Sequence, residues 1–318
     1  MSRFTRWVQI WDARERPDVL AVVRLLVGAV VLYDLITVVE LDLIAGLYAP
    51  LEAGGMGNPL GRSQVPGLYQ WFEPSVGTAT AATWLAMAAA GSFMVGAGTR
   101  MSALILVLTW AQLASVLPPA DRGIDMLLRN VLVILMCSGC GQAWSLDARL
   151  RTGRWQGSGA QVPAWPRLLL VCQLLVVYGT AGVQKVGISW LPMGEWSALY
   201  IVLRDPAFGL LSLSTLDRFY VLTQVATGLS WLWEWATPLA ALAWWYRATR
   251  QRSGRLRAWM NSHGFYWKWV CLGACFHLGT AATMQLGVFP FGMLALYPCF
   301  FHPDTWRSLQ RKKPPATG

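Results

Sequence analysis

The sequence predicts an all-α fold: a polytopic integral membrane helical bundle of about eight transmembrane helices, with both termini in the cytoplasm. Two observations support this, a scarcity of charge and the sorting of the cations along the chain. The 318 residues are 55% hydrophobic and 13% charged, with 19 tryptophans, whereas soluble domains carry about 25% charged residues. The mean hydropathy is +0.41. This composition excludes a soluble enzyme, a disordered tail and a small disulfide scaffold.

The individual spans follow from apolar length, because a helix needs about 20 residues to cross about 30 Å of hydrocarbon. One membrane domain over 18–302 is expected, between a cytoplasmic segment at 1–17 and a basic cytoplasmic tail at 303–318. Within 1–17, the apolar side chains indicate either a helix lying on the membrane surface or an ordinary lead-in. The eight runs are approximately 18–38, 78–98, 101–118, 124–143, 166–186, 221–246, 266–284 and 285–302.

Two longer connections, 39–77 and 187–220, contain apolar stretches that are too short to span. They predict re-entrant or surface helices on the outer face. Irregular backbone at membrane depth is tolerated only where it is buried in protein or lines a water-filled cavity. We therefore expect a pocket that opens outward.

The cations test the proposed orientation. With the N-terminus inside, the five inner segments hold four, one, four, six and four Lys or Arg residues, nineteen in all, and the outer segments hold four. This asymmetry obeys the positive-inside rule. Because the cations are divided among five segments, no nucleic-acid partner is predicted. The 22 arginines against four lysines suggest a GC-rich bacterium, so we expect a multi-pass protein in the lipid bilayer of a bacterial inner membrane.

Ionisable residues inside spans are functional candidates by default. The outer half of the bundle is expected to collect Asp34, Asp125, Arg129, Lys185 and His277. Two fold-fixing ion pairs are predicted. Arg129 can meet Asp125 at spacing i, i+4, and Arg24 is matched with Glu234 by depth.

Lys185 has no evident acidic partner and is the chief candidate. A partly desolvated lysine can lose its proton near neutral pH, which arginine cannot; the alternative is a lysine that snorkels to the interface. His277 is either reactive or a hydrogen-bonding residue between helices. Tyr178 shares the helix face of Lys185, and Trp190 follows it, so both join Asp34, Asp125 and Arg129 in the supporting polar cluster.

The Cys137–Cys140 spacing, CSGC, occurs in redox and metal sites. No second ligand pair follows it, so no metal is predicted. Its place at the cytoplasmic end of a span, in a reducing compartment, argues against a redox role. A helix end with small residues is the favoured interpretation.

Several stretches resemble a known family. AGVQKVGISW at 181–190 resembles the lysine motif of vitamin K-dependent gamma-glutamyl carboxylases, and 277–298 resembles their last helical pair. GIDMLLR at 123–129 and SLDAR at 145–149 are similar to bacterial members, the horizontally transferred transmembrane domain (HTTM) proteins. The chain is identified as a member of the HTTM family, resembling the membrane domain of the carboxylases.

The resemblance implies an activity. In the carboxylases, the lysine at the place of Lys185 deprotonates reduced vitamin K, and oxygen then forms an epoxide through a strongly basic alkoxide. This base removes a γ-proton from a peptide glutamate, and the carbanion adds CO2. By resemblance, Lys185 and His277 are catalytic. Reduced vitamin K of the menaquinol-type hydroquinone class, O2 and CO2 are the co-substrates, and a secreted peptide is the substrate.

Two departures favour an alternative. The carboxylases carry a histidine in the outer connection before the fourth span, where this chain reads PADRGID at 119–125. They also hold their substrates with a large lumenal domain, whose role a partner membrane protein is expected to fill here. The alternative is a non-enzymatic membrane component for maturation, export or immunity of a secreted peptide, of the sporulation-delaying toxin maturation type. A transporter is a weaker option, since inverted repeats are not apparent.

Overall fold

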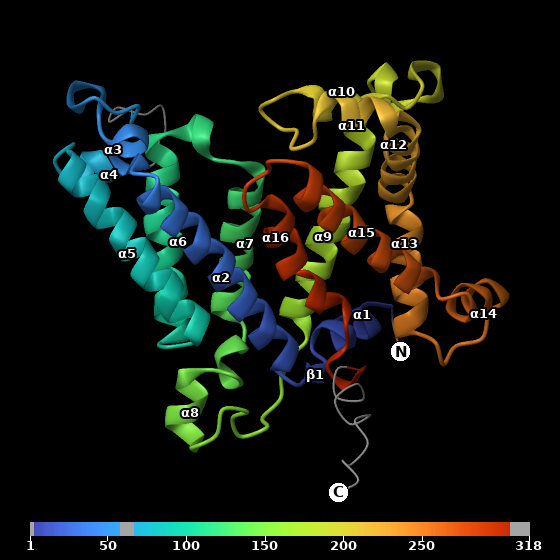
Figure 1. Cartoon of the computed structure of the whole chain (residues 1–318). Coiled ribbons are helices and arrows are strands. Elements are labelled where there is room, and N and C mark those ends of the chain that lie inside the picture. The colour runs from blue at the N-terminus through green and yellow to red at the C-terminus, as the bar shows by residue number, and fades with distance from the viewer. Residues whose placement is uncertain (1–2, 58–66, 306–318) are drawn as a thin grey trace, which may run out of the picture. The chain divides into compact units, whose positions relative to one another are not determined.

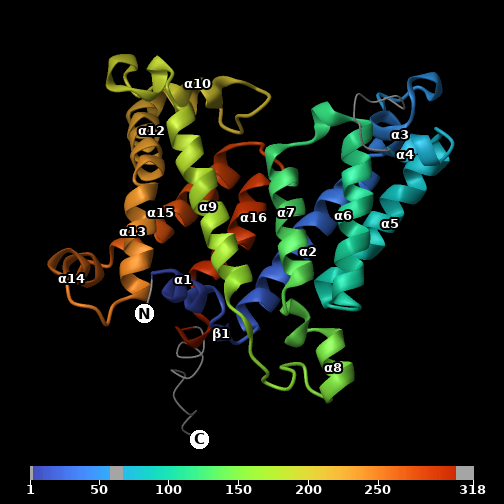
Figure 2. The same cartoon turned by 180° about the vertical axis from the view of Figure 1, so that it is seen from behind.

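The computed structural model describes residues 3–57 and 67–305, and the chain divides into two compact units. The first unit comprises residues 1–170 and 301–318, and the second residues 171–300 (Figures 1 and 2). Both consist mainly of helices, as predicted. Within the described residues, the paired strands are β1 (Arg14–Glu15) and β2 (Val162–Pro163), which are antiparallel with Arg14 opposite Pro163.

Among the described residues, four helices are long and apolar enough to cross a membrane, and each matches a predicted span. They are α2 (Asp18–Glu40), α5 (Val76–Val95), α6 (Thr99–Val116) and α9 (Trp165–Gln184). Large apolar side chains on their surfaces, such as Leu85, Leu108 and Val176, are exposed, as lipid contact requires. The full number of crossings, their orientation and the location of the termini stay predictions.

Three of the other predicted spans are shorter or divided. The run 124–143 forms α7 (Gly123–Cys137), about 22 Å long at 1.5 Å per residue. The run 221–246 forms α12 (Tyr220–Trp235) and α13 (Thr237–Ala248), which follow one another end to end in Figure 1. The division has a clear cause, because Pro238 lacks an N–H and its ring excludes the carbonyl of residue 234. The run 285–302 forms α16 (Phe289–Ala295) and a 3-10 turn at Tyr297–Phe300.

The first unit is built around α2, α5, α6 and α7. Helix α2 packs against α5, which packs against α6, and α6 packs against α7. In the first turn of α8 (Leu146–Thr152), the carboxylate of Asp147 accepts hydrogen bonds from the backbone N–H groups of Gly98 and Thr99, and so caps the start of α6. The shorter helical elements of this unit are α1 (Arg3–Trp11), α3 (Leu43–Tyr48), α4 (Leu68–Trp71), α8 (Leu146–Thr152) and 3-10 turns at Leu51–Ala53, Pro118–Ala120 and Cys140–Gln142.

The second unit contains most of α9 and everything up to residue 300. Its centre is aromatic: the indoles of Trp233 on α12 and Trp269 on α15 (Phe265–Thr283) stack at 5.2 Å, and each donates to the other's backbone carbonyl. Short helices occupy the predicted outer segment 187–220. The remaining elements are 3-10 turns at Ile188–Trp190 and Pro192–Gly194, α10 (Ala198–Arg204), α11 (Leu213–Arg218), α14 (Arg255–Ser262) and α15 (Phe265–Thr283).

Parts of some predictions lie outside the described residues. These are residues 1 and 2 of the segment 1–17, residues 58–66 of the outer segment 39–77 and residues 306–318 of the basic tail. The helical N-terminal segment is present as α1, and its place on a membrane surface stays a prediction.

Candidate functional site

Lys185, the chief candidate, forms an ion pair with Glu234. Helix α9 ends at Gln184, so that Lys185 is the first residue after the helix. Its Nζ lies 2.6 Å from each carboxylate oxygen of Glu234 on α12. The side chain of Lys185 is 19% exposed and that of Glu234 only 4%. Gly182 makes this approach possible, because a Cβ there would lie 2.9 Å from the Cβ of Glu234.

The ammonium of Lys185 also faces aromatic rings at the wall of a large cavity. Nζ lies 4.5 Å from the ring centroid of Trp190 and 5.9 Å from that of Phe276, both within the range of cation–π attraction. The cavity beside it has a volume of about 570 Å³, a size typical of ligand pockets. Its walls are mainly apolar and include Leu199, Leu203, Leu216, Leu229, Trp233 and Phe289.

Tyr178 and His277 meet behind this wall. The Tyr178 hydroxyl lies 2.7 Å from Nε2 of His277 and 3.1 Å from the hydroxyl of Tyr297, and all three residues are buried. Nδ1 of His277 has no hydrogen-bond partner among the described residues. The Tyr178 ring packs 4.6 Å from that of Trp233, which lines the cavity. His277 itself is not one of the lining residues.

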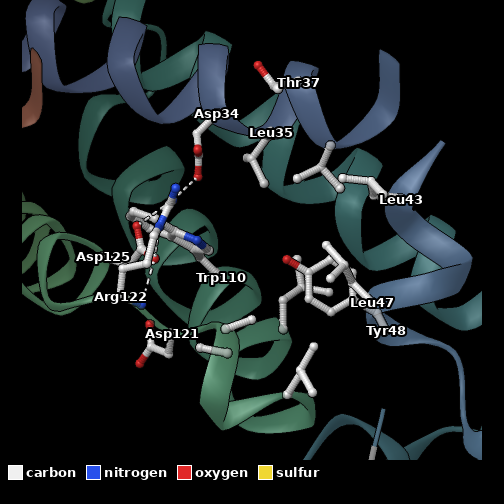
Figure 3. Close-up of a pocket in the computed structure, with 15 residues that line it drawn as sticks. Asp34, Leu35, Thr37, Leu43, Leu47, Tyr48, Trp110, Asp121, Arg122 and Asp125 are labelled. Carbon is white, nitrogen blue, oxygen red and sulfur yellow. Dashed lines mark hydrogen bonds and ion pairs between the residues drawn. The ribbon is translucent and has the colours of Figure 1, made fainter. Parts of the chain in front are cut away.

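The other members of the expected polar cluster lie in the first unit. Nη2 of Arg122, just before α7, is 2.5 Å from a carboxylate oxygen of Asp34 on α2 and 2.9 Å from one of Asp125. These residues border a separate cavity of about 250 Å³ (Figure 3). Of the residues in the predicted cluster, Asp34, Asp125 and Arg129 thus belong to the first unit, and Lys185 and His277 belong to the second.

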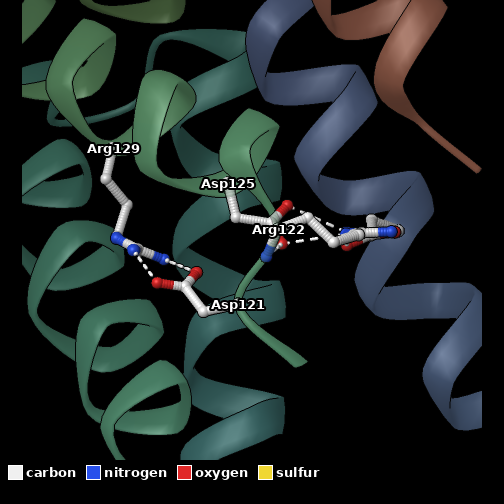
Figure 4. Close-up of polar contacts among 5 residues, drawn as sticks. Asp121, Arg122, Asp125 and Arg129 are labelled. Atoms are coloured by element: carbon white, nitrogen blue, oxygen red, sulfur yellow. Dashed lines mark hydrogen bonds and ion pairs between the residues drawn. The ribbon is translucent and has the colours of Figure 1, made fainter. Parts of the chain in front are cut away.

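Arg129 does not pair with Asp125, so that prediction is wrong. Its two Nη atoms lie 2.8 and 2.6 Å from the two carboxylate oxygens of Asp121 (Figure 4). Asp125 instead turns back over the start of α7, where it accepts hydrogen bonds from the backbone N–H and the guanidinium of Arg122. Helical spacing identified two neighbours on one helix, but the turn before the helix supplies the better partners.

The expected pair of Arg24 with Glu234 is also replaced. The buried Arg24 guanidinium donates to the backbone carbonyls of Cys140 and Trp144. Carbonyls after a helix end lack partners within the helix, so they can accept hydrogen bonds from the two Nη groups of this cation in place of a carboxylate. Glu234 pairs with Lys185, and Lys185 is therefore not the unpaired cation that the sequence indicated.

The two cysteines of the CSGC pair lie at the end of α7 and at the start of the turn that follows it. Cys137 is exposed on the last turn of α7, and Cys140 is buried with its Sγ 3.2 Å from the carbonyl oxygen of Leu135. Neither is in a disulfide. Across the described residues, no group of three or more His, Cys, Asp or Glu side chains is placed to hold a metal ion.

Sequence reasoning missed four contributors: Asp121, Arg122, Trp233 and Tyr297. Arg122 had a local signal, because it stands three residues before Asp125 at the start of a helix. Tyr297 had none, since it reaches Tyr178 from a 3-10 turn 119 residues later in the chain.

Comparison with known proteins gives one match. The HTTM domain model matches residues 13–233, more than half of the chain. The matched region includes Lys185, and it ends directly before Glu234. No curated protein and no solved structure matches the chain.

Proposed function

Because the chain belongs to the HTTM domain family, a membrane domain family related to vitamin K-dependent carboxylase, we propose that it is a hydroquinone-using membrane enzyme. In this proposal, a menaquinol-type hydroquinone binds beside Lys185, and its epoxidation drives carboxylation of a glutamate in a secreted peptide. One observation carries the proposal: the amine of Lys185 stands at the wall of an apolar cavity of about 570 Å³.

The cavity suits such a substrate in size and chemistry. Ligand pockets of roughly 300–1,000 Å³ lined by apolar and aromatic side chains, with a few polar groups, are typical of small-molecule sites. The leucine and phenylalanine side chains offer contact to an isoprenoid tail. Trp190, whose ring lies against the Lys185 ammonium, offers a face for an aromatic ring.

The ion pair gives Lys185 a way to become a base. Lys185 and Glu234 lie close enough to share a proton, and moving that proton to the carboxylate leaves an uncharged amine and an uncharged acid. An apolar wall favours this uncharged pair over two separate charges. The free amine lone pair can then accept the hydroxyl proton of a hydroquinone.

The overall reaction balances with the co-substrates named. One hydroquinone and one O2 give one epoxide and one water, while the peptide glutamate loses a γ-proton and gains CO2. His277 acts in this proposal through its neighbours, because it contacts Tyr178 and does not line the cavity. We assign His277 a positioning role: it holds Tyr178, whose ring packs against Trp233 in the cavity wall.

The test uses purified protein with a menaquinol-type hydroquinone, O2, bicarbonate and a glutamate-containing peptide. Epoxide and carboxylated peptide are expected from the wild type and not from Lys185→Arg. Arginine can keep the ion pair with Glu234, yet it cannot give up its proton at any working pH. Absence of epoxide from the wild type, or full activity in Lys185→Arg, would contradict the proposal.

A second candidate is a non-enzymatic membrane component for maturation, export or immunity of a secreted peptide. The Lys185–Glu234 contact favours it, because a buried ion pair also serves to fix helix packing. In that case Lys185→Arg retains full peptide maturation or immunity in cells, and the isolated protein forms no epoxide.

A further inference from the structure

The cavity of about 250 Å³ in the first unit has a strongly divided lining. One wall is apolar and is formed by leucines of α2, α3 and α6. The opposite wall is charged and is formed by Asp34, Asp121, Arg122 and Asp125 (Figure 3). At about 30 Å³ per water molecule, this space holds roughly eight waters or one small organic molecule.

The charges in this wall do not cancel. Asp34, Asp121 and Asp125 supply three carboxylates, and Arg122 and Arg129 supply two guanidiniums, so that one formal negative charge is left over. Arg129 and Asp121 satisfy each other through two hydrogen bonds. The remaining negative charge therefore belongs to Asp34 and Asp125, which share the single guanidinium of Arg122.

Of these two residues, Asp34 is the less satisfied carboxylate. Asp125 accepts hydrogen bonds from the backbone N–H, Nε and Nη2 of Arg122. Asp34 accepts a single one, from Nη2 of Arg122 to Oδ2, so its Oδ1 has no donor among the described residues. A carboxylate has about four lone-pair sites, and Asp34 lines the cavity, so it has acceptor sites left for a further donor.

The cavity offers a second polar group opposite the carboxylate. In Figure 3 the hydroxyl of Tyr48 points into the cavity, toward the charged wall. It makes no hydrogen bond to another described residue. Burial raises the pKa of Tyr48 to about 12, with Asp34 and Asp125 adding to the effect, so the hydroxyl stays protonated at neutral pH.

We propose that this cavity binds a small organic ammonium ion, with the charged nitrogen at Asp34, its second contact at Tyr48, and the apolar part against the leucines of α2, α3 and α6. The surplus negative charge selects a cation over an anion. The apolar wall selects an alkyl or aryl ammonium over an inorganic ion, which would leave that surface against water. The ammonium can belong to a free amine or to the aminoethyl headgroup of a lipid.

The experiment titrates full-length protein in detergent with 2-phenylethylammonium, using calorimetry, and compares it with uncharged 2-phenylethanol. We expect saturable binding of the ammonium and at least about tenfold weaker binding of the alcohol, because a hydrogen bond to a charged group is worth this much. Asp34→Asn should weaken ammonium binding by about tenfold or more. Glu73→Gln is the matched control, since it removes an exposed carboxylate of the same unit outside the cavity, and it should bind as the wild type does.

Two further arms complete the test. Tyr48→Phe should weaken ammonium binding several-fold, and it serves as the main variant if Asp34→Asn does not fold. In nanodiscs, weaker probe binding with phosphatidylethanolamine than with phosphatidylglycerol identifies a lipid headgroup as the occupant, whereas equal binding identifies a free amine. No saturable ammonium binding, equal binding of the alcohol, or wild-type affinity in both Asp34→Asn and Tyr48→Phe would overturn the proposal.

Discussion

Lys185 and Glu234 form an ion pair at 2.6 Å across 49 residues of sequence, with the carboxylate almost wholly buried. The pair joins the end of α9 to the last turn of α12. Two charged groups that are buried to this extent are tolerated in the fold only when they pair with each other. The same contact thus ties two helices together and places a titratable amine at the cavity wall, so its structural and chemical roles need separate measurements.

The structural role can be measured by removing one charge and then both. Lys185→Met leaves Glu234 buried without its partner, and we expect a loss of about 3 kcal/mol in the free energy of unfolding. The double variant Lys185→Met with Glu234→Leu should recover most of that loss, because an apolar pair needs no counter-charge. Unfolding in detergent, followed by near-UV circular dichroism, measures both. Equal stability of the single variant and the wild type would show that the pair is not formed.

Tyr178→Phe tests the buried polar contact behind the cavity. The substitution removes the hydroxyl that lies against His277 and Tyr297 and leaves Nε2 of His277 unpartnered in an apolar setting. We expect a loss of about 1–3 kcal/mol in unfolding free energy. Tyr33→Phe is the matched control, since Tyr33 is 61% exposed, and it should unfold at the wild-type temperature. Similar unfolding temperatures for the two variants would rule out the Tyr178–His277 hydrogen bond.

The pH dependence of stability should include a contribution from Asp147. Burial alone would raise the pKa of this carboxyl, but hydrogen bonds from the hydroxyl and backbone of Thr99 and the backbone of Gly98 outweigh it, and the pKa falls below its ordinary value of 3.8. A lowered pKa in the folded state means that the carboxylate stabilises the fold at pH values above about 4. That contribution is lost as the pH falls through the lowered value.

Thermal unfolding of the wild type and Asp147→Asn between pH 3 and pH 7 measures this effect. The variant should unfold at a lower temperature at pH 7, and the difference should shrink as the pH falls below about 4. A difference that stays constant across the range would assign the effect to side-chain shape rather than to charge.

The sequence predicted α2, α5, α6 and α9 well, because for these helices apolar length alone decides the structure. The ring centroid of Trp190, which the sequence grouped with Lys185 in the supporting cluster, lies 4.5 Å from Nζ of that lysine. The prediction failed at 221–246, where composition stays apolar through a break that Pro238 imposes on the backbone. Apolar composition indicates a preference for lipid, and it does not show that one residue, Pro238, lacks a backbone N–H.

Ion-pair partners were the least predictable part of the site. Depth along straight helices matched Arg24 with Glu234, and helical spacing matched Arg129 with Asp125. Both arguments omit the segments between helices, which supply Asp121 to Arg129 and two backbone carbonyls to Arg24. Partner choice depends on where these turns place the chain, and that position is fixed by tertiary packing.

The packing of α2 against α5 provides a final prediction. A Cβ at Gly28 would lie 2.7 Å from the Cα of Met94, and backbone cannot yield as a flexible side chain can. Gly28→Ala should therefore cost about 1–3 kcal/mol in unfolding free energy, even though alanine favours a helix by up to about 1 kcal/mol. Gly46→Ala on α3, where a Cβ meets nothing within 4 Å, should leave stability unchanged or slightly raised. If both variants gain stability in detergent unfolding, α2 and α5 do not approach this closely, because helix propensity alone then accounts for the result.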